Sequence, residues 1–198
     1  MLVLLDNGHG SETPGKRSPK FNGQPQILEY EYNRRLTMEI VKALRANSID
    51  CDLLVRETND VSLSERCRRV NNYVKAHGRK NVLLVSVHLN AAENKAATGW
   101  EIHTYTGQSI SDLYATIFHD NAKSVLKTDA KMRGDWSDKD PDFDSNFAML
   151  RDTACPSVLT ENMFMTNESD CKKLNDPKFF NKLVKLHVDS IIQITNLI

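Results

Sequence analysis

Two histidines and one glutamate follow runs of apolar residues, where folding would bring them to one edge of a sheet. His9 lies in Asp-Asn-Gly-His-Gly, directly after the apolar residues 2–5. His88 follows the most strand-like run of the chain, Asn-Val-Leu-Leu-Val-Ser-Val, and Glu161 closes the run Val-Leu-Thr. Because ligand sites in α/β sheets gather at the carboxyl ends of strands, we expect these three side chains to converge.

A carboxylate near the start of the first predicted helix, either Glu29 or Glu31, would complete a set of two His and two Glu. A catalytic zinc ion typically has three protein ligands and one open position for water, and two His with one Glu is a known set. Zinc activates the bound water and polarises a scissile carbonyl group. A second Glu that is not a ligand can take the proton of the water and deliver it to a leaving amine. Such a set suits the hydrolysis of an amide.

Each of these residues also has an ordinary structural explanation. A single His at a strand end is usually a surface or capping residue, and a Glu near a helix start often stabilises the helix dipole. Glu161 alone could be a surface charge. Spacing by itself therefore leaves both interpretations open. The other histidines lack a comparable placement, and we expect structural or solvent-facing roles for His77, His103, His119 and His187.

The elements that must position these groups alternate between apolar strands and amphipathic helices, a pattern that predicts an α/β layer architecture. Strands are predicted over residues 2–5, 51–55, 81–87, 100–105, 147–150 and 157–161. Helices are predicted over residues 30–47, 63–74, 110–126 and 179–194, the second of them opened by the capping box Ser62-Leu-Ser-Glu65. Residues 128–145 form a long Asp-rich segment, which we expect either to line the substrate groove or to be a solvated loop.

Composition sets the remaining limits. The chain has 198 residues, which suits one domain, and 26 basic residues balance 26 acidic ones, so the net charge is zero. A chain without net positive charge is a poor candidate for a nucleic-acid partner. We see neither a signal peptide nor an apolar stretch of the roughly 20 residues that span a bilayer, so no membrane partner is expected. The four cysteines form no Cys-x-x-Cys pair, and we expect free thiols.

Four segments, in this order, resemble the zinc N-acetylmuramoyl-L-alanine amidases of the cell-separation and phage-lysin type, the amidase-3 family. They are Leu-Leu-Asp-Asn-Gly-His-Gly at 4–10, Glu-Tyr-Glu-Tyr-Asn at 29–33, Ser-Val-His-Leu-Asn-Ala at 86–91 and Leu-Thr-Glu-Asn-Met-Phe-Met-Thr-Asn at 159–167. The resemblance implies that Zn²⁺ is held by His9, Glu29 and His88, and that Glu161 is the catalytic acid–base group. It thereby favours Glu29 over Glu31 as the ligand.

Weaker matches between these segments extend the resemblance over essentially the whole chain. They include Arg56 to Arg66, Gly-Trp-Glu at 99–101 and Arg-Gly at 133–134. The chain departs from the family after the catalytic Glu, where Asn162 and Met163 occupy a stretch in which the family usually has glycines. Val55 replaces a common Thr. These departures remove no predicted ligand.

The resemblance implies a single catalytic α/β domain over residues 1–198, with a mixed, mostly parallel sheet flanked by helices. The expected activity is hydrolysis of the amide between N-acetylmuramic acid and the L-alanine of the peptidoglycan stem peptide, by a monomer acting at the cell wall. Release as a phage lysin and export with a signal peptide since removed both fit. Two alternatives remain: a zinc peptidase that cuts within the stem peptide, and a non-catalytic domain that binds peptidoglycan.

Overall fold

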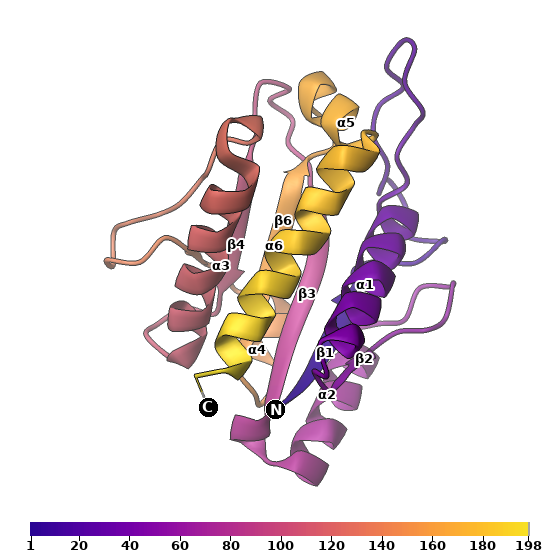
Figure 1. The fold of residues 1–198 in the computed structure, drawn as a ribbon. Helices are drawn as coiled ribbons and strands as arrows, with labels where there is room; N and C mark the ends of the chain where they lie inside the picture. The colour runs from indigo at the N-terminus through magenta and orange to yellow at the C-terminus, as the bar shows by residue number, and fades with distance from the viewer. Residues whose placement is uncertain (198) are drawn as a thin grey trace.

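A mixed sheet forms the centre of the protein (Figure 1). The structure is a computed structural model and describes residues 1–197. In chain order, the strands are β1 (Leu2–Asn7), β2 (Cys51–Leu53), β3 (Val82–Asn90), β4 (Trp100–Thr104), β5 (Phe143–Asp144) and β6 (Ser157–Phe164). They lie in the spatial order β2-β1-β3-β6-β4-β5. Neighbouring strands are parallel except for β4 and β6, which are antiparallel. The prediction of a mixed, mostly parallel sheet is confirmed.

Helices cover both faces of this sheet, as predicted. They are α1 (Glu29–Ala46), α2 (Leu63–His77), α3 (Ile110–Leu126), α4 (Ala148–Arg151), α5 (Glu168–Leu174) and α6 (Pro177–Thr195), with short 3₁₀ turns at Arg79–Asn81 and Lys127–Asp129. Figure 1 shows α1, α6 and α3 in front of the sheet and α2 and α4 behind it. Each face has its own apolar core, a large one under α1, α3 and α6 and a smaller one under α2 and α4.

Strand β3 shows why the sequences of the central strands are almost continuously apolar. Leu83 and Val85 pack into the larger core, whereas Val82 and Leu84 pack into the smaller one. Successive side chains of a strand point to opposite faces, so Ser86 and His88 lie on the same face as Leu84, the face that α2 and α4 cover. A strand buried on both faces needs apolar residues at every position except where a polar side chain has a function or a partner.

Local signals set the ends of the helices. The hydroxyl of Ser62 accepts a hydrogen bond from the backbone N–H of Glu65 at the start of α2, and Gly78 ends this helix with φ of 88°, a conformation that favours glycine. Ser109 and Asp112 form a capping box at the start of α3, whose bounds agree with the prediction.

The structure corrects one predicted element and adds two, β5 and α5. Residues 147–150 were predicted as a strand, but residues 148–151 form the short helix α4. A short apolar run does not distinguish the two, because periodicity needs more residues than four. Helix α5 has no counterpart in the prediction. Strands β3 and β6 continue to residues 90 and 164, so His88 and Glu161 lie within the strands. Within residues 1–197, no helix combines the length and the apolar character that crossing a membrane requires.

Candidate metal centre and active site

Three predicted metal ligands meet at the carboxyl edge of the sheet. Nε2 of His9 and Nδ1 of His88 each lie 3.3 Å from Oε1 of Glu29. The two imidazole rings meet edge to face, with centroids 5.0 Å apart. One ligand atom from each of the three residues lies within 4.8 Å of the others. The structure thus brings together the His and Glu residues that the sequence singled out.

The backbone after β1 is held in an unusual conformation that places His9. The N–H of Gly8 donates to the carbonyl of Val87, which continues the pairing between β1 and β3. His9 itself has φ of 69°, in the left-handed region that residues with a side chain rarely adopt. Two guanidinium groups hold its carbonyl oxygen, that of Arg34 and that of Arg66, each at 3.0 Å. These bonds offset the cost of the local backbone strain.

Glu29 and Glu31 separate clearly in the structure. Glu29 is the first residue of α1 and is fully buried, whereas Glu31 is exposed and accepts a hydrogen bond from the hydroxyl of Tyr30. The N–H of Leu89, next to His88, donates to Oε1 of Glu29 at 3.1 Å. At the start of α1, Glu29 therefore contacts the two histidines, whereas Glu31 does not.

The electrostatics of the three residues fit a bound cation. Burial by itself would raise the pKa of Glu29, but hydrogen bonds from His88 and His9 lower that pKa well below its ordinary value, so Glu29 is ionised. Its second oxygen, Oε2, is sealed from solvent and has no hydrogen-bond partner. The ammonium group of Lys16 lies 4.0 Å from this oxygen. A buried, ionised carboxylate with an oxygen that accepts no hydrogen bond, facing two imidazoles, is a donor set that suits zinc.

Glu161 lies beside this centre on β6. Its Cα pairs with that of His88 on β3, so the two side chains share a face of the sheet. Glu161 is half-buried, and its Oε2 is sealed from solvent without a hydrogen-bond partner. Burial raises its pKa to about 8, with the negative charges of Glu29 and Glu101 adding to the shift and the charge of His88 opposing it. A carboxyl group with such a pKa can both accept and donate a proton near neutral pH.

The two departures from the family after Glu161 have structural roles. Met163 has φ of 75°, which explains why the family usually has a glycine at that position; here the fully buried methionine side chain packs in the core instead. Asn162 donates to the carbonyl of His88 at 3.1 Å and accepts from the indole N–H of Trp100 at 2.9 Å. It therefore ties β6 to both neighbouring strands directly behind the candidate site.

A buried ion pair supports the segment that carries His9. The guanidinium of Arg66, on α2, donates to Oδ1 of Asp6 at 2.6 Å and to the carbonyl of Asn7 at 3.0 Å. The hydroxyl of Ser86 donates to the other oxygen of Asp6 at 2.6 Å. Arg66 and Asp6 are almost fully buried. Both residues lie in segments that resemble the family, but their contact cannot be predicted from the sequence because they are 60 residues apart.

A second group of charges lies on the other side of Glu161. Glu101 on β4 pairs with Glu161 across the antiparallel strands. Arg133 donates to one oxygen of Glu101, while Asn90 and His103 contact the other. The pKa of Glu101 is lowered: burial opposes the shift, and His103 and Arg133 outweigh it. His103 has the structural role expected for it in this network.

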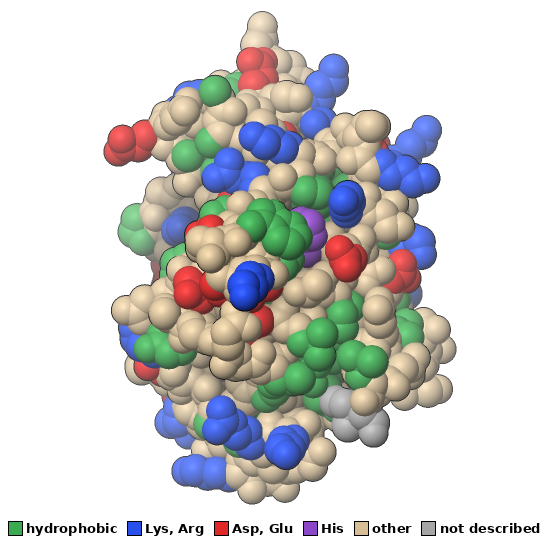
Figure 2. Space-filling model, turned by 90° about the vertical axis from the view of Figure 1, so that its left-hand side faces the viewer, with side chains coloured by type: hydrophobic (Ala, Val, Ile, Leu, Met, Phe, Trp, Pro, Cys, Tyr) green, Lys and Arg blue, Asp and Glu red, His purple; other side chains and the backbone are tan. Residues whose placement is uncertain are grey.

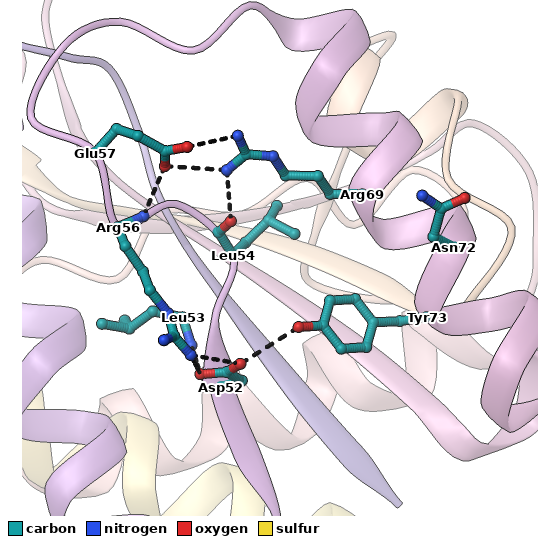
Figure 3. A pocket seen from close by; sticks show the side chains of 8 residues that line it. All are labelled: Asp52, Leu53, Leu54, Arg56, Glu57, Arg69, Asn72 and Tyr73. Carbon is teal, nitrogen blue, oxygen red and sulfur yellow. Dashed lines mark hydrogen bonds and ion pairs between the residues drawn. The ribbon is translucent and has the colours of Figure 1, made fainter.

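A cleft opens beside the centre. Its volume is about 280 Å³, and its lining includes Gly8, His9, His88, Asp60 and Leu63. Another pocket, of about 300 Å³, lies between β2 and α2 (Figure 3). Its charged groups bind one another: Arg56 pairs with Asp52 and Arg69 with Glu57, as the dashed lines show. Of these two pockets, the cleft is the one that two predicted metal ligands line, His9 and His88.

Two half-buried histidines around a buried glutamate, with a further glutamate beside them at the carboxyl edge of an α/β sheet, are typical of a metal-dependent hydrolase. The family model described as N-acetylmuramoyl-L-alanine amidase, Amidase_3, matches residues 3–193. The chain therefore belongs to the amidase-3 family, as the resemblance implied.

Individual relatives agree with this membership. The chain is 28% identical to an endolysin of Bacillus phage SPP1 over 99% of its own length, and 28% identical to the N-acetylmuramoyl-L-alanine amidase CwlM of Bacillus licheniformis over 98%. It spans 66% and 69% of the length of these two relatives, about two thirds. The crystal structure of an N-acetylmuramoyl-L-alanine amidase from Clostridium difficile 630 superposes with a TM-score of 0.81 at 27% identity, covering 98% of this chain and 96% of that one. The predicted fold class is confirmed.

Proposed function

We propose that this chain is a zinc-dependent hydrolase that cuts the amide between the lactyl group of N-acetylmuramic acid and the L-alanine of the stem peptide. His9, Glu29 and His88 would hold the zinc ion. Glu161 would be the acid–base group. The observation that carries the proposal is the convergence of His9, Glu29 and His88 with Glu161 directly beside them in strand register, in a chain of the amidase-3 family.

Each residue has a distinct role. Zinc, when bound, supplies a Lewis acid that polarises the scissile carbonyl and activates water for attack on it. The Glu161 carboxylate takes a proton from the attacking water and passes it to the nitrogen of the leaving L-alanine, which departs as a neutral amine. Glu29 stays ionised throughout, because its two histidine partners hold its pKa low. The bonds of Arg66 and Arg34 to the carbonyl of His9 keep this ligand in place between turnovers.

The cleft beside the centre would receive the peptidoglycan strand. Because its substrate forms the cell wall, the enzyme would act there, either as a lysin or as an exported enzyme. We further propose that the catalytic unit is one domain and acts as a monomer, since every group assigned a role comes from a single sheet edge of one chain. No nucleic-acid or membrane partner is needed for this activity.

The first experiment measures the metal content of the purified protein and its digestion of cell walls. We expect one zinc ion per chain, loss of activity on chelation and recovery with added zinc. His88→Ala is expected to lose both zinc and activity, whereas His77→Ala, a change at an exposed histidine at the end of α2, is expected to keep both.

Mass analysis of the digested wall then identifies the bond. New amino termini on L-alanine support the amidase. Cleavage within the stem peptide would instead indicate the peptidase alternative, and binding of muropeptides without turnover would indicate the binding-domain alternative. Protein that binds no zinc and digests nothing would contradict the proposal as a whole.

A further inference from the structure

Three aspartates meet far from the His9–His88 pair in sequence and on another part of the fold. Asp112 lies in the first turn of α3, and Asp140 and Asp142 lie in the segment that leads to β5. One oxygen from each lies within 4.8 Å of the others. Figure 1 shows the segment after α3 projecting from the side of the molecule, and Figure 2 shows acidic side chains gathered in the middle of that face.

Two of these carboxylates are buried and that of Asp140 is half-buried, although aspartates are mostly exposed in proteins. Asp112 and Asp142 are 4% and 3% exposed. Oδ1 of Asp142 and Oδ1 of Asp140 are both sealed from solvent, and neither has a hydrogen-bond partner. The prediction of a solvated acidic loop is therefore wrong for Asp142. Two buried, unpartnered oxygens in one small cluster indicate that something else satisfies them.

The donors around the cluster are too few for its oxygens. The hydroxyl of Thr104 lies 2.6 Å from Oδ2 of Asp142 and 3.2 Å from Oδ1 of Asp112, but it has one hydrogen to donate. The backbone N–H of Ser109 donates to Oδ2 of Asp112 at 2.5 Å, and the amide of Gln108 donates to Oδ2 of Asp140 at 2.8 Å. None of these donors reaches Oδ1 of Asp140 or Oδ1 of Asp142.

The charge of the cluster is also uncompensated. Among the ion pairs of residues 1–197, none joins a Lys, Arg or His to Asp112, Asp140 or Asp142. Without a cation, burial raises the pKa of Asp142 to about 8, and the neighbouring Asp140 and Asp112 add to the shift. Burying carboxylates without a positive partner is strongly unfavourable, so the cluster needs either a proton or a metal ion.

We propose that Asp112, Asp140 and Asp142 bind a Ca²⁺ ion. The available donors are all oxygens, which is the ligand type that Ca²⁺ prefers and zinc does not. Asp140 and Asp142 are two residues apart, the spacing at which calcium loops present successive carboxylates. Water would complete the coordination on the solvent side, because three side chains supply fewer than the six to eight oxygens that Ca²⁺ takes.

The ion would add a link between two parts of the fold. It would fix the segment before β5 to the start of α3, and the hydroxyl of Thr104 ties the same cluster to the end of β4. The other end of this segment carries Arg133, which contacts Glu101 beside Glu161. Calcium would therefore add to the hydrogen bonds that hold this segment to β4.

The test is calcium binding by zinc-saturated protein in chelator-treated buffer, measured by equilibrium dialysis with ⁴⁵Ca²⁺ in the presence of millimolar Mg²⁺. We expect one Ca²⁺ per chain. Asp142→Asn and Asp140→Asn are expected to weaken binding by about tenfold or more, because each removes one ligand charge. The matched control is Asp135→Asn, a change at an exposed aspartate of the same segment outside the cluster, which is expected to bind as the wild type does.

Thermal denaturation gives a second readout that does not depend on activity. At a Ca²⁺ concentration about 100 times the wild-type Kd, the Tm of the wild type is expected to rise by about 5–10 °C, and that of Asp142→Asn to rise by about half as much or less. The proposal would be overturned if the wild type binds no calcium at millimolar concentration, or if Asp140→Asn binds it as well as Asp135→Asn does. A proton shared between the carboxylates would then reduce their negative charge. Zinc content, determined in the same samples, keeps this result separate from the proposed hydrolase activity.

Discussion

A Cβ atom on Gly8 would lie 2.0 Å from Cε1 of His88. No side chain fits in that space, and the obstacle is the ring of a predicted metal ligand. Residue 8 must be glycine so that the chain after β1 can pass against the histidine of β3 and present the next residue, His9, to the same point. The glycine before His9 is thus required by the close packing of the chain against His88.

Gly8→Ala is therefore expected to displace the His88 ring and to weaken zinc binding and wall hydrolysis strongly, with the fold retained. Metal analysis and circular dichroism of the same preparation check this. The control is Gly15→Asn, in an open turn with φ of 74° where no atom lies near the added Cβ and asparagine tolerates the conformation. Full zinc content in Gly8→Ala would show that the ring can move without loss of the site.

Glu29→Gln is expected to lose zinc, whereas Glu31→Gln is expected to keep zinc and activity. The first change removes the charge of the buried carboxylate that faces both histidines, and the second changes an exposed side chain two residues away. The two substitutions are chemically identical, so they form a matched pair for metal analysis. Equal zinc content in both variants would contradict the assignment of Glu29 as a ligand.

The difference between these two glutamates shows what the sequence alone could not predict. Two residues along a helix correspond to about 200° of rotation, so Glu29 and Glu31 face opposite directions. The sequence places both near the helix start but does not say which face meets the sheet; the resemblance to the family selected Glu29. By contrast, the apolar runs before His9, His88 and Glu161 mark strand ends by themselves, and for parallel strands these ends meet at one edge.

The features that the sequence did not predict depend on contacts between distant segments. Aspartate in a loop is usually exposed, and only the packing of residues 140–142 against α3 and β4 shows that Asp142 is buried. The helix at 148–151 has four residues, too few for periodicity to distinguish it from a strand. The backbone conformation of Met163 is likewise invisible in the sequence, except as a departure from a glycine that the family prefers.

Glu161→Gln is expected to keep zinc and to lose wall hydrolysis by about 10²–10⁴-fold, the usual contribution of an acid–base group. Glutamine has nearly the same shape but cannot take the proton of the attacking water. The control is Glu168→Gln, at an exposed position at the start of α5. Turnover rates and zinc content are measured on the same samples, and a loss of zinc in Glu161→Gln would mean that Glu161 is itself a ligand.

Arg66→Ala is expected to reduce the free energy of unfolding by about 3–5 kcal/mol, because it leaves the buried charge of Asp6 without its partner. Zinc affinity is expected to fall by about 10–100-fold, since Arg66 also holds the carbonyl of His9. Arg68→Ala removes an exposed pair with Glu65 on the same helix and is expected to cost less than about 1 kcal/mol. Urea unfolding and zinc titration of both variants test this difference. Similar losses of stability and of zinc affinity in the two variants would contradict a special contribution from the buried Arg66 pair.

His187 provides a stability prediction that is independent of the metal centre. Its Nδ1 lies 2.7 Å from the carbonyl of Leu183 and therefore carries the hydrogen, so Nε2 accepts from the hydroxyl of Thr160 at 3.0 Å. This arrangement uses the neutral ring, which is fully buried. Burial lowers the pKa of His187 to about 4, opposed by the bond to Leu183.

Since the folded-state pKa lies below the unfolded-state value of about 6.5, the unfolded chain takes up a proton first as the pH falls. His187 should therefore lower the free energy of unfolding by up to about 3 kcal/mol between about pH 7 and pH 4, and His187→Gln, which has no titrating group, should lack this component. Urea unfolding of both metal-free proteins across this range isolates the effect, because every other titrating group is common to the two. Parallel pH profiles would mean that the folded protein admits the proton to His187, which a ring bonded to Thr160 and Leu183 should not allow.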